Sequence, residues 1–164
     1  MSVDVPTFRQ AMGLFPGAVT LITTGEGDLR RGITATAVCS VTDSPPSLLV
    51  CVNRKTGTCM EIARSGRFSV QLLGQDHADV AMAFAGAGGQ SGGDKFASGD
   101  WGACPAGLPR LSGALASISC EVTAATDAGS HTVFIGRMTD VAFAENGEAL
   151  IYAGTRFHRI EAVA

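Results

Sequence analysis

The chain has 164 residues and a mass of 16.8 kDa, which suits one domain around one hydrophobic core. Its formal net charge is −3, and no basic stretch is longer than Arg30-Arg31 or Arg54-Lys55. Because phosphate contacts supply most of the affinity of nucleic-acid binders, DNA or RNA is not an expected partner. The sequence also lacks a signal-peptide pattern and the ~18 consecutive apolar residues of a membrane span, so we expect a soluble, cytoplasmic domain over residues 1–164.

Apolar residues make up 46% of the chain and charged residues only 16%, against roughly 25% in average proteins. Obligate interfaces resemble a core cut in half, so this composition favours a homodimer in which each copy covers apolar surface of the other. A well-filled core in a single copy is the alternative interpretation.

The cysteines and histidines show no metal-binding pattern. The five cysteines are an odd number and include no C-x-x-C pair. Structural zinc sites need closely spaced ligand pairs, and the disulfide frameworks of secreted domains usually need an even count. We therefore expect free, mostly buried thiols and no metal site.

In chain order, the first half predicts a helix followed by β-structure. Apolar residues recur at helical spacing over residues 7–15 and predict a one-faced helix, which ends at Pro16-Gly17. Residues 18–24 are β-rich and are followed by turn residues, so a hairpin is expected there. Residues 32–42 alternate with period two, which predicts one long strand with its hydroxyl side chains on one face.

The rest of the chain predicts further strands, two short helices and a mobile surface loop. The expected strands are residues 47–52, 68–72, 117–123, 131–143 and 149–152. The expected helices are residues 56–64 and 76–84, and the loop covers residues 86–99. Many strands, few short helices and frequent tight turns predict a mainly β fold, an antiparallel Greek-key barrel with a few short helices.

The segment 51–58 joins a buried strand to a helix and is a candidate anion site. Unpaired N–H groups and the positive dipole end of a helix attract phosphate, Thr56 or Thr58 can cap that end, and Arg54 and Lys55 add charge. An ordinary capped helix with two solvated basic side chains is the alternative.

Three hydroxyl side chains, Thr34, Thr36 and Ser40, are candidates to line a polar cleft, and a solvent-facing strand surface is the alternative interpretation. His131 follows Gly129-Ser130 at a turn tip, where a histidine either contacts a ligand or is simply exposed. No G-x-S-x-G motif and no G-x-G-x-x-G fingerprint between a strand and a helix is present, so neither a serine nucleophile nor a Rossmann site is expected.

Several short motifs occur in one order and spacing from about Phe8 to Phe157. They are the runs FPGAVT (residues 15–20), GITATA (32–37), DSPPSL (43–48), CVN (51–53), DKF (94–96) with the later Trp101, and GSHT (129–132). Taken together they resemble the short-chain flavin reductases, the reductase components of two-component flavin-dependent monooxygenases. Two positions depart from the family pattern: Ser130 stands where an acidic residue is usual before His131, and Gln71 stands where Asn is frequent.

The resemblance implies a split β-barrel that forms a homodimer, with a flavin held near the subunit interface. The residues that it places at the flavin ring and ribityl chain are Thr34, Ala35, Thr36, Ala37, Ser40, Cys51, Val52 and Asn53. Those that it assigns to the phosphate are Lys55, Thr56 and Thr58. Those that it expects to close the other side of the pocket are Phe84, Ala85, Gly86, Lys95 and Phe96. His131 would contact the nicotinamide as the catalytic residue, and Tyr152 and Arg156 would complete the pocket.

The resemblance further implies an NAD(P)H:flavin oxidoreductase, with NADH or NADPH as donor and FAD or FMN as acceptor. Reduced flavin would pass to a partner monooxygenase, for which a phenol-type aromatic hydroxylase is the commonest family association. A flavin carrier of the same barrel without efficient turnover is the alternative, followed by a non-catalytic dimeric barrel used for interaction. The departure at Ser130 bears on nicotinamide affinity and on the choice between NADH and NADPH.

Overall fold

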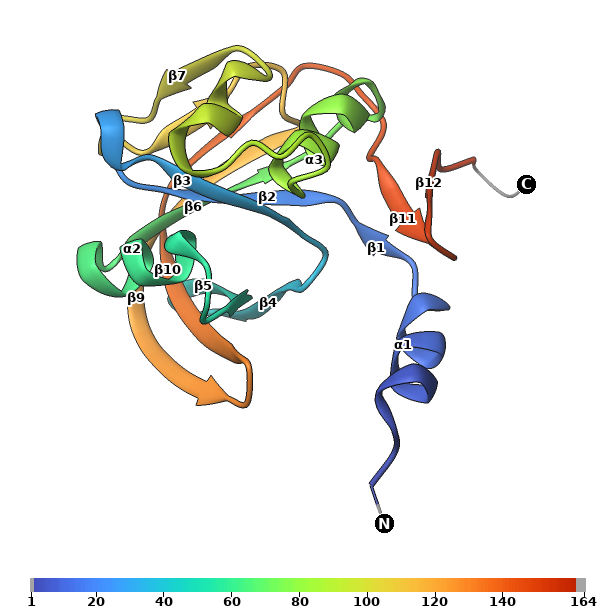
Figure 1. Cartoon of the computed structure of the whole chain (residues 1–164). Helices are drawn as coiled ribbons and strands as arrows, with labels where there is room; N and C mark the ends of the chain where they lie inside the picture. Colours follow the sequence, from blue (N-terminus) through green and yellow to red (C-terminus); the bar gives the residue numbers. More distant parts are fainter. Residues whose placement is uncertain (1, 162–164) are drawn as a thin grey trace.

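A seven-stranded antiparallel sheet forms the body of the molecule in the computed structural model, which describes residues 2–161 (Figure 1). The strands are β1 (Gly17–Ala18), β2 (Thr20–Thr24), β3 (Arg31–Ala35), β4 (Val38–Asp43), β5 (Pro46–Asn53), β6 (Arg67–Leu72), β7 (Trp101–Ala103), β8 (Pro109–Leu111), β9 (Ala116–Ala128), β10 (His131–Phe143), β11 (Ile151–Ala153) and β12 (Arg156–His158). The helices are α1 (Val5–Gly13), α2 (Gly57–Ser65) and α3 (Ala78–Phe84), and the 3-10 turns are η1 (Gly27–Leu29), η2 (Gln75–His77) and η3 (Gly92–Ala97).

The strand order of the large sheet is β3-β2-β6-β9-β10-β5-β4. Its two edge strands, β3 and β4, are consecutive in the chain and are separated only by Thr36 and Ala37. The sheet must therefore curl until its edges approach each other. The N–H of Cys51 in β5 donates to the carbonyl of Ala37 at 3.1 Å, which extends the β4–β5 pairing by one residue into this corner. The expected mainly β antiparallel barrel with a few short helices is confirmed.

Apolar residues are buried on both faces of the sheet. One core cluster contains Ile22, Val52, Phe68 and Phe134, and α2 packs against it through Ile62. The second cluster lies on the opposite face, under α3 and β8, and includes Leu21, Leu73, Phe84, Phe96 and Leu111. Because consecutive residues of a strand point to opposite faces, Leu21 and Ile22 enter different clusters, and β2 is buried along its whole length.

The prediction of one continuous strand over residues 32–42 is wrong. The chain bends at Thr36 and Ala37, where the N–H of Val38 donates to the carbonyl of Thr36 at 2.9 Å. β3 then pairs with β2 and β4 with β5, so the two halves belong to opposite edges of the sheet. Ser40 lies on the exposed edge strand β4 and does not share a face with Thr34 and Thr36.

The first helix forms, but earlier than predicted and without burying its apolar face. The N–H of Thr7 donates to the Asp4 carboxylate at 2.8 Å, so α1 begins at Val5 and ends at Gly13. No residue of α1 is buried, and its apolar side chains Phe8 and Met12 remain 58% and 47% exposed. In Figure 1 this helix lies apart from the barrel, beside the small sheet β1-β11-β12.

Other helix and strand boundaries also differ from the predicted ones. The predicted helix over residues 76–84 divides into η2 and α3, and the predicted loop over residues 86–99 contains η3. β9 runs on to Ala128, so β9 and β10 form one long hairpin whose far end extends beyond the barrel in Figure 1. The strands β7, β8 and β12 were not predicted, since each has only three residues and shows no clear alternation.

Candidate active site

Three hollows surround the corner between β3 and β4. The central cleft has a volume of about 640 Å³ and is lined by Ile33, Thr34, Ala35, Thr36, Ala37, Cys51, Asn53, Thr56, Phe84, Ala85, Lys95, Ala128, His131 and Val133. The outer cleft has a volume of about 550 Å³ and is lined by Val19, Thr34, Ala35, Thr36, Ala81, Met82, Ala85, Gly86, Ala87, Tyr152 and Phe157. The helix hollow has a volume of about 270 Å³ and is lined by Arg31, Gly32, Ile33, Thr56, Gly57, Thr58, Gln90, Ser91, Gly92 and Lys95.

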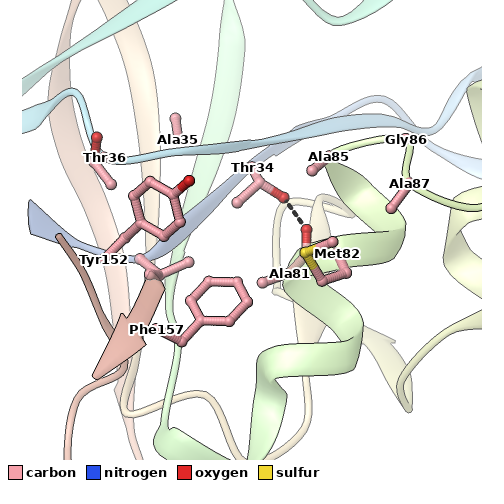
Figure 2. Close-up of a pocket in the computed structure, with 11 residues that line it drawn as sticks. Thr34, Ala35, Thr36, Ala81, Met82, Ala85, Gly86, Ala87, Tyr152 and Phe157 are labelled. Atoms are coloured by element: carbon pink, nitrogen blue, oxygen red, sulfur yellow. Dashed lines mark hydrogen bonds between the residues drawn. The ribbon is translucent and has the colours of Figure 1, made fainter. Parts of the chain in front are cut away.

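The end of β3 separates the central cleft from the outer cleft, because Thr34, Ala35 and Thr36 line both. The hydroxyl of Thr34 donates to the carbonyl of Ala81 in α3 at 2.5 Å, so it ties β3 to the helix (Figure 2). Two of the three hydroxyl residues predicted to line a cleft are therefore at the clefts, and Thr34 uses its hydroxyl within the protein.

The outer cleft is bounded by two aromatic rings from the small sheet. Tyr152 and Phe157 pack edge to face, with ring centroids 5.6 Å apart, opposite Met82 of α3 (Figure 2). Phe157 and Met82 were not among the sequence-predicted residues. The predicted residue Arg156 is exposed on β12 and does not line the cleft, because its neighbour Phe157 takes the inward position.

The connection from β5 to α2 is held by local hydrogen bonds. The Asn53 side-chain oxygen accepts from the N–H of Lys55 at 2.9 Å, and the Thr56 hydroxyl donates to the Asn53 carbonyl at 2.7 Å. Thr56 also accepts from the N–H of Cys59 at 3.2 Å and so caps α2. The N-terminus of α2, with its remaining free N–H groups, therefore faces the helix hollow.

Arg31 and Lys95 are the basic residues that line the helix hollow, whereas the predicted Lys55 is exposed and lines none of the three clefts. Arg31 Nη1 donates to the carbonyls of Asp28 and Arg30 at 2.8 and 2.7 Å, which hold the guanidinium beside Gly57. Sequence reasoning noted Arg31 only as part of a short basic pair. Its position immediately before the candidate strand at Gly32 is the signal that could have placed it at the site.

Lys95 lies where the central cleft meets the helix hollow. Its ammonium donates to the carbonyl of Phe84 at 2.8 Å and to that of Gly32 at 3.2 Å. Burial lowers the pKa of Lys95 below its ordinary value. The side chain thus joins η3, the end of α3 and β3 around the clefts.

The predicted residues Val52 and Phe96 support the site from behind. Val52 is fully buried in the core cluster inside the barrel. Phe96 is also buried, and its ring centroid lies 5.0 Å from that of Phe84 and 4.8 Å from that of Trp101. Phe84 forms an aromatic wall of the central cleft. Phe96 and Trp101 fix the position of the Phe84 ring but do not line the cleft themselves.

His131 begins β10 and lines the central cleft. Its backbone is paired with Asn53 of β5 and Ala128 of β9, and both of these residues line the same cleft. Residues from β3, from the β5–α2 connection, from the end of α3 and from the β9–β10 turn are therefore brought together from distant parts of the sequence.

Residues 2–161 contain no group of three or more His, Cys, Asp or Glu side chains placed to hold a metal ion. Over the same residues, no helix has the length and apolar character needed to cross a membrane. The five cysteines are free, and burial raises the pKa of the Cys120 thiol to about 12, which makes it a poor nucleophile.

The sequence profile of the "Flavin reductase like domain" family matches residues 12–161. The chain belongs to this family. The chain is 40% identical, over 94% of its length and 91% of the relative's, to the "4-hydroxyphenylacetate 3-monooxygenase reductase component" of Pseudomonas aeruginosa. It is 38% identical to "FMN reductase (NADH) RutF" of Pseudomonas syringae, with 97% of this chain and 88% of that protein covered.

Among solved structures, the chain resembles "Flavin reductase PheA2 in native state" with a TM-score of 0.88 and 34% identity, and the match covers 98% of this chain and all of that one. The barrel is therefore the split β-barrel of this family, as the sequence motifs led us to expect. The helix hollow and the two clefts lie around the corner where the edges of that barrel approach each other.

Proposed function

We propose that this flavin reductase transfers hydride from NADH to FMN or FAD in the central cleft and passes the reduced flavin to a separate monooxygenase. The observation that carries the proposal is that Thr34, Asn53 and His131, far apart in sequence, line one cleft that continues into the helix hollow. The similar protein described as an FMN reductase with NADH supports this choice of donor. NADPH is the alternative donor.

The walls of the central cleft fit a flat heterocycle. Ala35, Ala37 and Ala85 have small side chains that leave space, and Phe84 contributes an aromatic face. We assign this cleft to the isoalloxazine ring, with the backbone at Thr36 and Ala37, where the strand pairing is interrupted, close to its polar edge.

The helix hollow fits the phosphate that FMN and FAD share. It offers the N-terminus of α2, the hydroxyl residues Thr56 and Thr58, and the guanidinium of Arg31. The hollow and the central cleft share Ile33, Thr56 and Lys95, so a ribityl chain can run from one to the other. We assign the outer cleft, with Tyr152 and Phe157, to the adenosine half of a dinucleotide.

Hydride transfer between nicotinamide C4 and flavin N5 is chemistry that the two bound molecules supply. The protein's residues align the two rings and keep water from the space between them. In this proposal Phe84 and the alanines of the central cleft fix the isoalloxazine ring. His131 holds the nicotinamide ring by binding the carboxamide of the nicotinamide. None of these roles needs a nucleophile or a metal ion.

The partner oxygenase is proposed as an aromatic hydroxylase of the phenol type. Similarity to the reductase component of 4-hydroxyphenylacetate 3-monooxygenase supports it. We also propose a homodimer, because Phe8, Met12 and Phe15 on and after α1 are 58%, 47% and 67% exposed and would be covered by a second copy.

An anaerobic mixing experiment tests the reaction. With catalytic amounts of protein, excess NADH should bleach the absorbance of oxidised FMN over many turnovers, and crossing both nicotinamides with FMN, FAD and riboflavin should rank the substrates. Bleaching that stops after one flavin per protein would favour the flavin carrier. NADH oxidation no faster than the spontaneous reaction with every flavin would refute the proposal.

His131→Ala tests the assignment of the nicotinamide. We expect KM for NADH to rise roughly ten-fold, as for a lost ligand hydrogen bond with some packing, while the Kd for FMN changes less than about two-fold. Equal losses in NADH and FMN affinity would contradict the role given to His131.

A further inference from the structure

The turn between β9 and β10 is fastened to the connection between β5 and α2. The Asp127 carboxylate accepts from the Thr132 hydroxyl at 2.7 Å and pairs with Arg54 Nη2 at 3.0 Å. The N–H of Arg54 in turn donates to the carbonyl of Ser130 at 3.0 Å. The backbone that carries His131 is therefore held on both sides of the turn.

One further contact acts on the imidazole itself. Ser130 Oγ lies 2.9 Å from His131 Nδ1, within hydrogen-bond distance. Because His131 lines the central cleft and Nδ1 is engaged by Ser130, Nε2 is the ring nitrogen left for a ligand. A neutral imidazole carries one N–H, so its tautomer decides whether Nε2 donates or accepts in the cleft.

A hydroxyl next to the ring selects between these tautomers. An imidazole nitrogen is a stronger base than a hydroxyl oxygen, so the favoured arrangement has the Ser130 O–H donating to Nδ1. The proton of the neutral ring then resides on Nε2. A carboxylate at position 130 would do the reverse, because it only accepts and therefore favours a proton on Nδ1.

We propose that Ser130 is a positioning residue that holds His131 as the Nε2–H tautomer and so presents a hydrogen-bond donor to the central cleft. The matching acceptor on the substrate is a carbonyl oxygen, which the carboxamide of nicotinamide provides. The substrate part of the inference rests on the proposed function, in which His131 contacts the nicotinamide. The tautomer itself does not depend on that function.

Nitrogen NMR measures the tautomer directly. The chain has three histidines, so protein labelled with ¹⁵N-histidine gives few ring signals, and His131→Asn identifies those of His131. At about pH 9, where free imidazole is neutral, wild type should show the Nε2–H tautomer. Ser130→Ala should show a mixture of both tautomers, Ser130→Thr the wild-type pattern and Ser130→Asp mostly Nδ1–H. The same tautomer populations in wild type and Ser130→Ala would overturn the proposal.

Kinetics then separate this inference from the proposed function. In Ser130→Ala, KM for NADH should rise about three- to ten-fold, as for the loss of one hydrogen bond, and KM for FMN should stay within about two-fold. Ser130→Thr should restore the wild-type value. Ser112→Ala, which removes an exposed serine hydroxyl elsewhere, is the matched control and should leave both KM values unchanged.

A shifted tautomer with an unchanged KM for NADH would leave the positioning role of Ser130 intact and contradict the nicotinamide role of His131. A changed KM with an unchanged tautomer would overturn the positioning role.

Discussion

Replacing Gly32 by alanine tests whether the aromatic wall of the central cleft is rigid. A Cβ at Gly32 would lie 2.5 Å from Cε1 and 2.8 Å from Cδ1 of Phe84, against about 3.5–4.0 Å for relaxed carbon contacts. Phe84 is only 1% exposed, and the rings of Phe96 and Trp101 lie 5.0 and 5.3 Å from its own. The ring therefore has little space into which to retreat.

The expected change in the free energy of unfolding follows from two opposing effects. Overpacking of a filled core costs about 1–3 kcal/mol, whereas alanine stabilises by about 0.4–1 kcal/mol because it narrows the unfolded ensemble. A Cβ added at Gly102, in strand β7, would meet no other atom within 4 Å, so Gly102→Ala keeps only the second effect. We expect Gly32→Ala to be less stable than Gly102→Ala by about 1–3 kcal/mol.

Urea unfolding followed by tryptophan fluorescence measures this difference, because Trp101 is the single tryptophan and lies in the affected cluster. A displaced Phe84 ring should also narrow the central cleft, so the Kd for FMN should rise in Gly32→Ala and not in Gly102→Ala. Equal unfolding midpoints for the two variants would refute the claim that Phe84 is held in place.

Two further predictions concern Arg31 and Glu61. Arg31→Leu should raise KM for FMN about ten-fold or more, as for a charged hydrogen bond, and leave riboflavin unaffected because riboflavin has no phosphate. An equal loss for both flavins would contradict a phosphate contact. In α2, Arg64 donates to both Glu61 carboxylate oxygens at 2.7 and 2.8 Å, and this hydrogen bonding lowers the pKa of Glu61 below its ordinary value. A carboxyl group whose pKa is lower in the folded state than in the unfolded state stabilises the fold at pH values above its unfolded-state pKa. That stabilisation is lost as the pH falls through the folded-state pKa. Glu61→Gln should therefore unfold about 0.5–1 kcal/mol more easily at pH 7, and urea titrations at several pH values should show that difference shrinking at acidic pH.

The sequence alone determined those features that depend on neighbouring residues. The predicted strand over residues 131–143 is the observed β10, and Thr56, the predicted first residue of the helix, caps α2, which begins one residue later at Gly57. Side-chain alternation along a strand and capping of a helix act over a few residues, so the sequence shows them directly. The motif order likewise identified the split β-barrel before any contact was known.

Only the tertiary structure decided which side chains meet at the clefts. The chain bends at Thr36 because β3 and β4 pair with different strands at opposite edges of the sheet. No local sequence pattern predicts this break between the two strands. The same curvature brings Arg31 to the start of α2 and leaves Lys55 in solvent, although Lys55 is far closer to the helix in sequence. Proximity along the chain determined the elements, whereas closure of the sheet determined the site.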